Sequence, residues 1–129
     1  MHEPLDERTL DQYSPLLLAY VGDAVYELMV RTRMVAAGQR PVREIHLDAV
    51  QKVKAEHQAR VIKNIFSQLP ATEQDIVRRG RNAKSTPPKN ADMQEYRLST
   101  GFEALIGYLY LKGDQRRLQE LLELSEEIV

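Results

Sequence analysis

Hydrophobic residues recur at helical spacing soon after the N-terminus, which predicts one long helix. The apolar positions of this run share one helix face: Leu17, Val21, Ala24, Leu28 and Val35. Ser14 and Pro15 precede the run and predict its start, because a serine side chain caps a helix and proline fits the first helical position. Gly38 predicts its end.

The middle of the chain continues the helical pattern, interrupted by prolines and glycines. Between residues 42 and 68 we expect a short helix and then a longer one, with Val50 on the apolar side of the second. Pro70 ends that helix. The next helix is predicted to run from Thr72 to Arg79, with Gly80 closing it.

The last third of the chain predicts an irregular segment and then two more helices. Two consecutive prolines and several turn formers exclude regular structure from residues 79–90. A helix is expected from about Asp92 to Gly113, and Asp114 is expected to cap a final helix that ends near Ile128. Because no segment alternates with a period of two, the sequence predicts an all-α protein.

The composition of the 129-residue chain is that of a globular protein, with 43% hydrophobic residues. This length predicts one compact domain, assigned to residues 14–129, after an N-terminal tail at residues 1–13. The chain has no cysteine, which excludes disulfides and thiolate metal sites. The first ten residues contain no apolar signal region, and no apolar run approaches the roughly 20 residues of a membrane span. We therefore expect a soluble, cytoplasmic protein with no membrane partner.

Charge is nearly balanced over the whole chain, which has a net charge of −1, but it is unevenly distributed. Residues 78–97 hold six basic side chains and two acidic ones, whereas acidic residues gather near the C-terminus. A basic stretch on a neutral protein is typical of a local nucleic-acid contact. The alternative is a solvated loop that is rich in proline.

Two lone carboxylates stand in otherwise apolar helical stretches. Asp23 lies within LAYVGDAVYE, residues 18–27, and Glu103 is the only charge in FEALIGYLYL, residues 102–111. If the two helices pack together, the carboxylates repel unless a cation or a proton lies between them. Oxygen ligands suit Mg²⁺ or Mn²⁺. The alternatives are that Asp23 caps a helix or pairs with an arginine, and that Glu103 reaches solvent at a helix edge.

These two stretches together resemble a known pair of motifs. VGDAVYE, followed later by STGFEALIGYLYL, resembles the catalytic domain of the ribonuclease III family. The short chain, the RGRNAKS…PPKN segment and the absence of an appended double-stranded-RNA-binding domain are similar to its Mini-ribonuclease III branch. The resemblance extends from about residue 16 to residue 124.

The resemblance implies an all-α endonuclease domain that forms a homodimer and cleaves double-stranded RNA with the help of divalent cations. The expected ion is Mg²⁺, with Mn²⁺ as the alternative. By this resemblance Asp23 and Glu103 are both the catalytic residues and the metal ligands. Because the branch is associated with maturing the ends of the large-subunit (23S) ribosomal RNA precursor, that precursor is the expected substrate.

The chain departs from the family pattern at its acidic positions. The pattern has further acids at three places, which here hold Leu16, Ala19 and Thr100. Fewer acids leave the number of metal ions per site open. Glu27 lies one turn beyond Asp23 and is a candidate to supply the missing charge, with an ion pair to Arg31 as the alternative.

A nuclease domain without a separate RNA-binding domain has to hold duplex RNA through its own surface. Duplex RNA is recognised mainly by shape, through phosphates and 2′-hydroxyls. The segment at residues 79–90 and its flank offer cations for phosphate and polar side chains for sugar hydroxyls. The candidate RNA-binding residues are Arg78, Arg79, Arg81, Asn82, Lys84, Ser85 and Lys89.

Three functions are compatible with these observations. The first is a divalent-cation-dependent endoribonuclease that acts on double-stranded RNA. The second is a non-catalytic RNA-binding or ribosome-associated protein of the same fold, which the missing acids favour. The third is an all-α metal-dependent hydrolase of nucleotides, which would need more acidic ligands and leaves the basic segment unexplained. Cleavage assays with and without Mg²⁺ separate the first function from the second.

Overall fold

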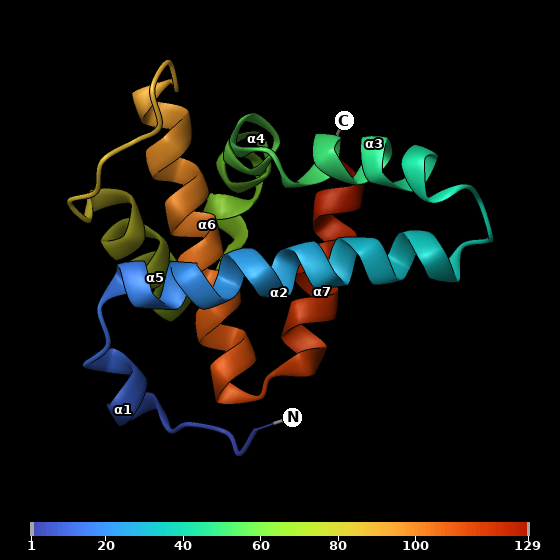
Figure 1. The fold of residues 1–129 in the computed structure, drawn as a ribbon. Coiled ribbons are helices and arrows are strands. Elements are labelled where there is room, and N and C mark those ends of the chain that lie inside the picture. The colour runs from blue at the N-terminus through green and yellow to red at the C-terminus, as the bar shows by residue number, and fades with distance from the viewer. Residues whose placement is uncertain (1, 129) are drawn as a thin grey trace.

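The computed structural model describes residues 2–128, and its regular structure is entirely helical over that range (Figure 1). The elements in chain order are α1 (Glu7–Asp11), α2 (Pro15–Ala36), α3 (Val42–Val53), α4 (Ala55–Ile65), the 3₁₀ turn η1 (Phe66–Gln68), α5 (Ala71–Asn82), α6 (Met93–Lys112) and α7 (Gln115–Glu126). The prediction of an all-α protein is therefore confirmed.

Helix α6 lies at the centre of the fold, and α2, α4 and α5 pack against it (Figure 1). Because its sequence is apolar on nearly every side, it is stable only when other helices cover it. Phe102, Leu105 and Ile106 of α6 are fully buried. Tyr26 of α2 meets Phe102 edge-on, with ring centroids 5.0 Å apart.

Two glycines set the close approach of α2 and α6. A Cβ atom on Gly22 would lie 1.7 Å from the backbone oxygen of Glu103, and one on Gly107 would lie 1.9 Å from the backbone oxygen of Leu18. No side chain fits in either place, so the two helices cross in backbone contact. Asp23, the next residue after Gly22, is therefore held at the crossing.

The prediction that Gly80 ends a helix is wrong. Helix α5 begins at Ala71 without a side-chain cap, one residue before the predicted start at Thr72, and continues through Gly80 to Asn82. A Cβ atom on Gly80 would lie 2.8 Å from the Cα atom of Gly101 in α6. Gly80 thus permits close packing of α5 on α6, and the irregular segment begins at residue 83 instead of 79.

The boundary between α3 and α4 also differs from the prediction. The two helices are nearly equal in length and meet at Lys54, whose backbone is extended. Val50 consequently belongs to the first helix of the pair and not to the second. Val50 is 40% exposed. It therefore contributes to the buried side of neither helix.

Four other predicted helix boundaries are observed, each with a local cause, whereas α4 ends at Ile65 and the 3₁₀ turn η1 separates it from Pro70. Ser14, Asp92 and Asp114 cap α2, α6 and α7, each by accepting a hydrogen bond from a backbone N–H of the first turn. Gly113 ends α6 in the left-handed conformation, with φ of 86°. Proline at the first position of α2 is also observed.

The sequence predicts a tail before α2, but the described part of this segment packs onto the helices. Leu10 of α1 is fully buried. The backbone N–H of Leu5 donates to the backbone oxygen of Leu111 at 2.9 Å, and Lys112 pairs with Glu7 at 2.8 Å. Met1 and Val129 lie outside the described residues.

Helix α7 is joined to α5 by an ion pair that is largely buried on its acidic side. Arg117 donates through Nε and Nη2 to the two carboxylate oxygens of Glu73, at 2.8 and 2.9 Å. Glu73 is only 7% exposed, so removing Arg117 would leave the Glu73 charge without compensation, whereas Arg117 also pairs with Glu120 at 3.3 Å. No helix among residues 2–128 has the length and apolar character that a membrane span requires.

Candidate active site

Asp23 of α2 and Glu103 of α6 face each other where these helices cross. Their carboxyl groups are close enough for a hydrogen bond and for electrostatic repulsion between them. Asp23 is exposed, whereas Glu103 is partly buried, so the pair opens to solvent on the Asp23 side. The structure thus brings together the two lone carboxylates of the sequence.

The surroundings of Glu103 disfavour its charge. Burial first, and then the neighbouring Asp23 carboxyl, raise the pKa of Glu103 from 4.5 to about 8, while the Gln58 side chain lowers it. At neutral pH the Glu103 carboxyl therefore holds a proton unless a cation takes its place. A divalent cation next to both carboxylates would favour the ionised form of each.

Gln58 of α4 is a third polar side chain at this site. It is only 1% exposed, and it lies close enough to Glu103 to affect the ionisation of that carboxyl. The sequence signal was a glutamine in the apolar pattern of α4, three residues after Ala55 and four before Ile62. Such a position is expected to hold a core residue, and a buried amide there needs an explanation.

The acidic set does not extend beyond this pair. Residues 2–128 contain no cluster of three or more histidine, aspartate or glutamate side chains that could hold a metal ion. The hydroxyl group of Thr100 donates to the backbone oxygen of Tyr96 at 2.9 Å. Glu27 forms the alternative ion pair with Arg31, at 3.3 Å. Two carboxylates still fit Mg²⁺, which commonly takes one or two from the protein and completes its shell with water and substrate phosphate.

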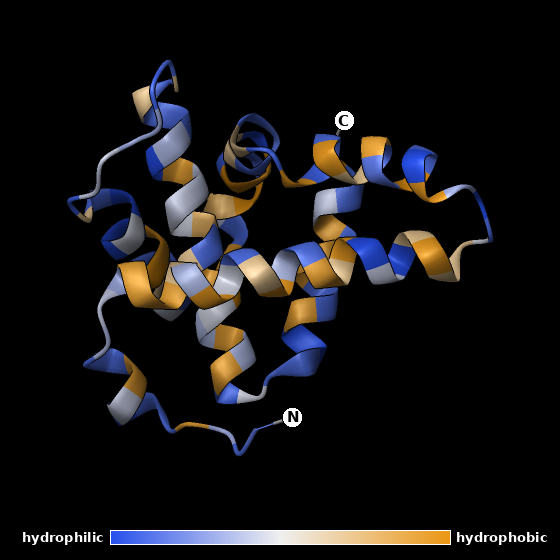
Figure 2. Cartoon of the chain, in the orientation of Figure 1, coloured by the Kyte–Doolittle hydropathy of each residue, from blue (hydrophilic) through white to orange (hydrophobic). Residues whose placement is uncertain are grey.

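An apolar hollow of about 470 Å³ adjoins the acid pair on α2. Its lining includes Asp23 together with mainly apolar neighbours: Tyr20, Val21, Ala24, Val25, Leu28 and Tyr110. Figure 2 shows hydrophobic stretches recurring along α2, which lies in front of the other helices in this view. Leu17, Tyr20 and Leu28 are 50%, 78% and 55% exposed. An apolar helix face of this kind favours an interface with another protein surface.

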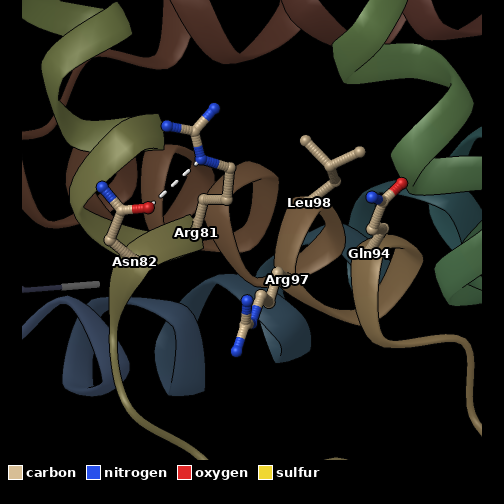
Figure 3. Close-up of a pocket in the computed structure, with 5 residues that line it drawn as sticks. All are labelled: Arg81, Asn82, Gln94, Arg97 and Leu98. Atoms are coloured by element: carbon tan, nitrogen blue, oxygen red, sulfur yellow. Dashed lines mark hydrogen bonds between the residues drawn. The ribbon is translucent and has the colours of Figure 1, made fainter.

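A second hollow, of about 320 Å³, lies between the end of α5 and the start of α6. Arg81 and Asn82 border it from α5, with the Arg81 Nε donating to Asn82 Oδ1 at 3.3 Å. Gln94, Arg97 and Leu98 border it from α6 (Figure 3). Arg97 belongs to the basic stretch of the sequence but not to the predicted RNA-binding residues. The guanidinium groups of Arg81 and Arg97 point in different directions in this view.

The structure divides the predicted RNA-binding residues among three surroundings. Lys84, Ser85 and Lys89 are exposed in the irregular segment at residues 83–92, which follows Arg81 and Asn82. Arg78 lies over the Phe66 ring, 5.2 Å from its centroid. Arg79 donates to the backbone oxygens of Tyr13 and Asp11, at 3.3 and 3.5 Å. Arg79 therefore links α5 to the end of α1 and the turn that follows it.

Comparisons with known proteins agree with this fold and site. Residues 16–114 match the Ribonuclease III domain family. A Mini-ribonuclease 3 from Thermoanaerobacter sp. is 53% identical over 90% of this chain and 82% of that protein. A Mini-ribonuclease 3 from Symbiobacterium thermophilum is 48% identical over 89% of each chain. A crystal structure of a Fusobacterium nucleatum protein superposes with a TM-score of 0.81 at 29% identity, covering 88% of this chain and 93% of that one.

The chain belongs to the ribonuclease III family, and within it to the Mini-ribonuclease III branch. It is therefore an endoribonuclease, a hydrolase of RNA. The resemblance seen in the two sequence motifs is confirmed. Enzymes of this family generally depend on divalent metal ions.

Proposed function

We propose that this protein cleaves double-stranded RNA in a reaction that depends on a divalent cation, Mg²⁺ or Mn²⁺. We further propose that its substrate is the precursor of the large-subunit (23S) ribosomal RNA, whose ends it matures in the cytoplasm. The observation that carries this proposal is the approach of Asp23 and Glu103 at an opening to solvent, with a pKa of about 8 for Glu103. Repelling carboxylates next to solvent favour a bound cation.

In this proposal the two acids have different tasks. Asp23 is exposed and adjoins the opening, so it would hold the cation directly, on the side that is open to RNA. Glu103 is partly buried and, once ionised, would hold the same ion or its waters. The bound cation would supply an activated water and would stabilise negative charge on the phosphate. No protein nucleophile is required, and neither carboxylate forms a covalent bond with RNA.

The cations at the end of α5 are proposed to hold the RNA backbone. Arg81, Asn82 and the exposed residues of the segment at 83–92 lie on one side of α6, and Arg97 lies across the hollow from Arg81. Arginine and lysine bind phosphate through charge-assisted hydrogen bonds. Arg79 contributes less, because its guanidinium group is already bonded to two backbone oxygens.

A second copy of the chain is proposed to cover the apolar face of α2. Leu17, Tyr20 and Leu28 are exposed on this helix, and the hollow beside them also contains Asp23. A two-fold dimer through this face would pair the same surface on both subunits. Because Asp23 borders this hollow, the dimer would also place the two acid pairs near its interface.

The substitution Asp23→Asn tests the catalytic part of the proposal. It keeps the shape of the side chain but removes the charge that binds the cation. We expect cleavage of a labelled RNA duplex to fall at least about a hundredfold, the size typical of losing one electrostatic catalytic group. Duplex binding by gel shift and dimer mass by light scattering should stay close to those of the wild type.

The matched control is Asp48→Asn, which removes an exposed carboxylate of α3 that pairs with Arg40 at 2.8 Å. This variant should cleave at the wild-type rate. Full turnover by Asp23→Asn would remove Asp23 from the mechanism. A wild-type protein that binds duplex RNA but shows no Mg²⁺-dependent cleavage would contradict the proposed dependence on a divalent cation.

A further inference from the structure

Gln58 combines nearly complete burial with an unused hydrogen-bond donor. Its side chain is 1% exposed. Within the described part of the chain, its Nε2 atom makes no hydrogen bond of good geometry, although the side chain lies near enough to the Glu103 carboxyl to lower the pKa of that group. A buried amide without a partner lowers stability, because the group loses its bonds to water and gains none in return. A hydrogen bond that the Gln58 amide forms only in another state of the protein would explain why a glutamine occupies this position.

The surroundings of Gln58 indicate what that partner is. Helix α4 packs against α6, and the Gln58 side chain lies beside the Glu103 carboxyl. The two oxygens of a carboxylate accept charge-assisted hydrogen bonds, so the Glu103 side chain offers the Gln58 donor a partner in the same packed region.

A neighbouring residue provides an internal comparison. His57 Nε2 is the other buried side-chain atom without a partner in residues 2–128. The charged groups that act on His57 are Lys52, Lys54, Arg60 and Glu126, and burial is the main cause of its lowered pKa. None of these groups belongs to the acid pair. The unused donor of Gln58 is thus the one that lies at the active site.

We propose that Gln58 is a positioning residue, whose buried amide donates to the Glu103 carboxylate and holds it toward Asp23 in the cation-bound enzyme. This inference rests on the proposed function. Thr100 bonds to its own helix and Glu27 bonds to Arg31. Neither of these side chains is therefore available to hold Glu103 in place. The amide compensates in part for the small number of acids, since a fixed ligand loses less freedom when the cation binds.

Substitution of Gln58 by leucine tests this role through Mg²⁺ dependence. Gln58→Leu keeps a side chain of similar size in the core and removes the donor. We expect the half-saturating Mg²⁺ concentration for cleavage to rise about tenfold or more, the size typical of losing a group that orients a metal ligand. The maximal rate should recover in part at high Mg²⁺, and the KM for RNA should stay unchanged. The control is His57→Leu, which removes the other buried unpaired atom of α4 and should leave the Mg²⁺ dependence unchanged.

A second measurement does not depend on activity or on the folding of a variant. In the wild-type protein, the side-chain NH₂ signals of Gln58 in a ¹⁵N correlation spectrum should shift as Mg²⁺ is added without RNA. In Asp23→Asn these signals should not respond to Mg²⁺. Signals that stay unchanged in the wild type up to the Mg²⁺ concentration that saturates cleavage would overturn the inference.

The outcomes separate this inference from the proposed function. Wild-type cleavage together with an unchanged half-saturating Mg²⁺ concentration in folded Gln58→Leu would overturn only the role of Gln58. A wild-type protein that cleaves no RNA duplex at any Mg²⁺ concentration would overturn the proposed function, and the inference with it.

Discussion

Helix α6 crosses two neighbours at pairs of glycines, and the two crossings differ in what they present to solvent. Gly107 of α6 meets α2 near Gly22. Asp23 and Glu103, which carry the two carboxylates, lie beside this contact. Gly101 meets α5 near Gly80, and the residues after that contact are Arg81 and Asn82, followed by an irregular segment.

The difference between these crossings lies in how firmly their functional side chains are held. Asp23 and Glu103 are short side chains at a backbone-to-backbone contact, so their separation follows directly from the helix crossing. Arg81 has a long, exposed side chain. Its Nε donates a hydrogen bond of 3.3 Å to Asn82 Oδ1, which is a neighbour in the chain. Catalytic ligands need fixed positions, whereas phosphate contacts tolerate adjustment because they add mainly electrostatic affinity. The fixed acid pair therefore suits the proposed catalytic role, and the less restrained Arg81 side chain suits the proposed phosphate contact.

The substitution Gly107→Ala should break the acid site most severely. Its new methyl group would lie 1.9 Å from the backbone oxygen of Leu18, so α2 and α6 would have to separate. We expect a loss of about 3 kcal/mol or more in the free energy of unfolding, at or above the upper end for overpacking. We also expect cleavage to fall about a hundredfold in the folded protein, because the carboxylates move apart. Urea unfolding and cleavage under folding conditions measure the two effects.

The matched variant at the other crossing is Gly80→Ala, whose methyl group would lie 2.8 Å from Gly101 Cα. A smaller overlap predicts a smaller loss of stability, about 1–2 kcal/mol, because alanine also favours the helix. The acid pair is not at this contact, so folded Gly80→Ala should cleave at close to the wild-type rate. Equal loss of cleavage in Gly80→Ala and Gly107→Ala would contradict the distinction between the two crossings.

The substitution Glu103→Gln should change how stability depends on pH. The folded pKa of Glu103, about 8, lies above its ordinary value of 4.5, so the folded protein keeps a proton that the unfolded chain releases. Without divalent cations, the wild type should therefore lose stability as the pH rises from about 5 to 8, by at most about 1.4 kcal/mol per pH unit. Glu103→Gln should lack this loss and be the more stable protein at pH 8.

Urea unfolding in EDTA at several pH values measures this difference. Asp23→Asn serves as the control, because it removes the neighbouring carboxyl but leaves the burial, which is the first cause of the raised pKa of Glu103. Part of the pH dependence should therefore remain in Asp23→Asn. Parallel pH profiles for the wild type and Glu103→Gln would contradict the raised pKa.

Signals between sequence neighbours predicted several helix ends, and a contact between distant segments explains why the predicted end at Gly80 was wrong. Ser14, Asp92 and Asp114 cap helices because their side chains reach the first turn of the same helix. Gly80 has the local appearance of a helix end, but its small size serves a contact with Gly101 on another helix. The pattern of one segment contains no information on that contact.

The same limit applies to the candidate site. Asp23 and Glu103 were recognisable as lone charges in apolar stretches, and the motif resemblance paired them. Gln58 was not recognisable as a site residue, because a single glutamine in an amphipathic helix is ordinary until its neighbours in space are known. Arg79 was predicted from charge alone, but its bonds to the Tyr13 and Asp11 backbone oxygens depend on how α5 packs.

The smallest effect on stability is expected on the basic side of α6, from Arg81→Ala combined with Lys84→Ala. Both side chains are exposed, so the free energy of unfolding should change by less than about 0.5 kcal/mol. Duplex RNA binding should weaken, and the slope of log K against log salt concentration should decrease by about one for each phosphate that the protein no longer neutralises. Gel shifts in an Asp23→Asn background measure binding without cleavage. The control is Arg116→Ala on α7, whose side chain is 94% exposed and which should leave the slope unchanged. An equal slope in the double variant and in Arg116→Ala would mean that another surface of the protein holds RNA. The exposed side chains of Arg81 and Lys84 would then have no part in binding.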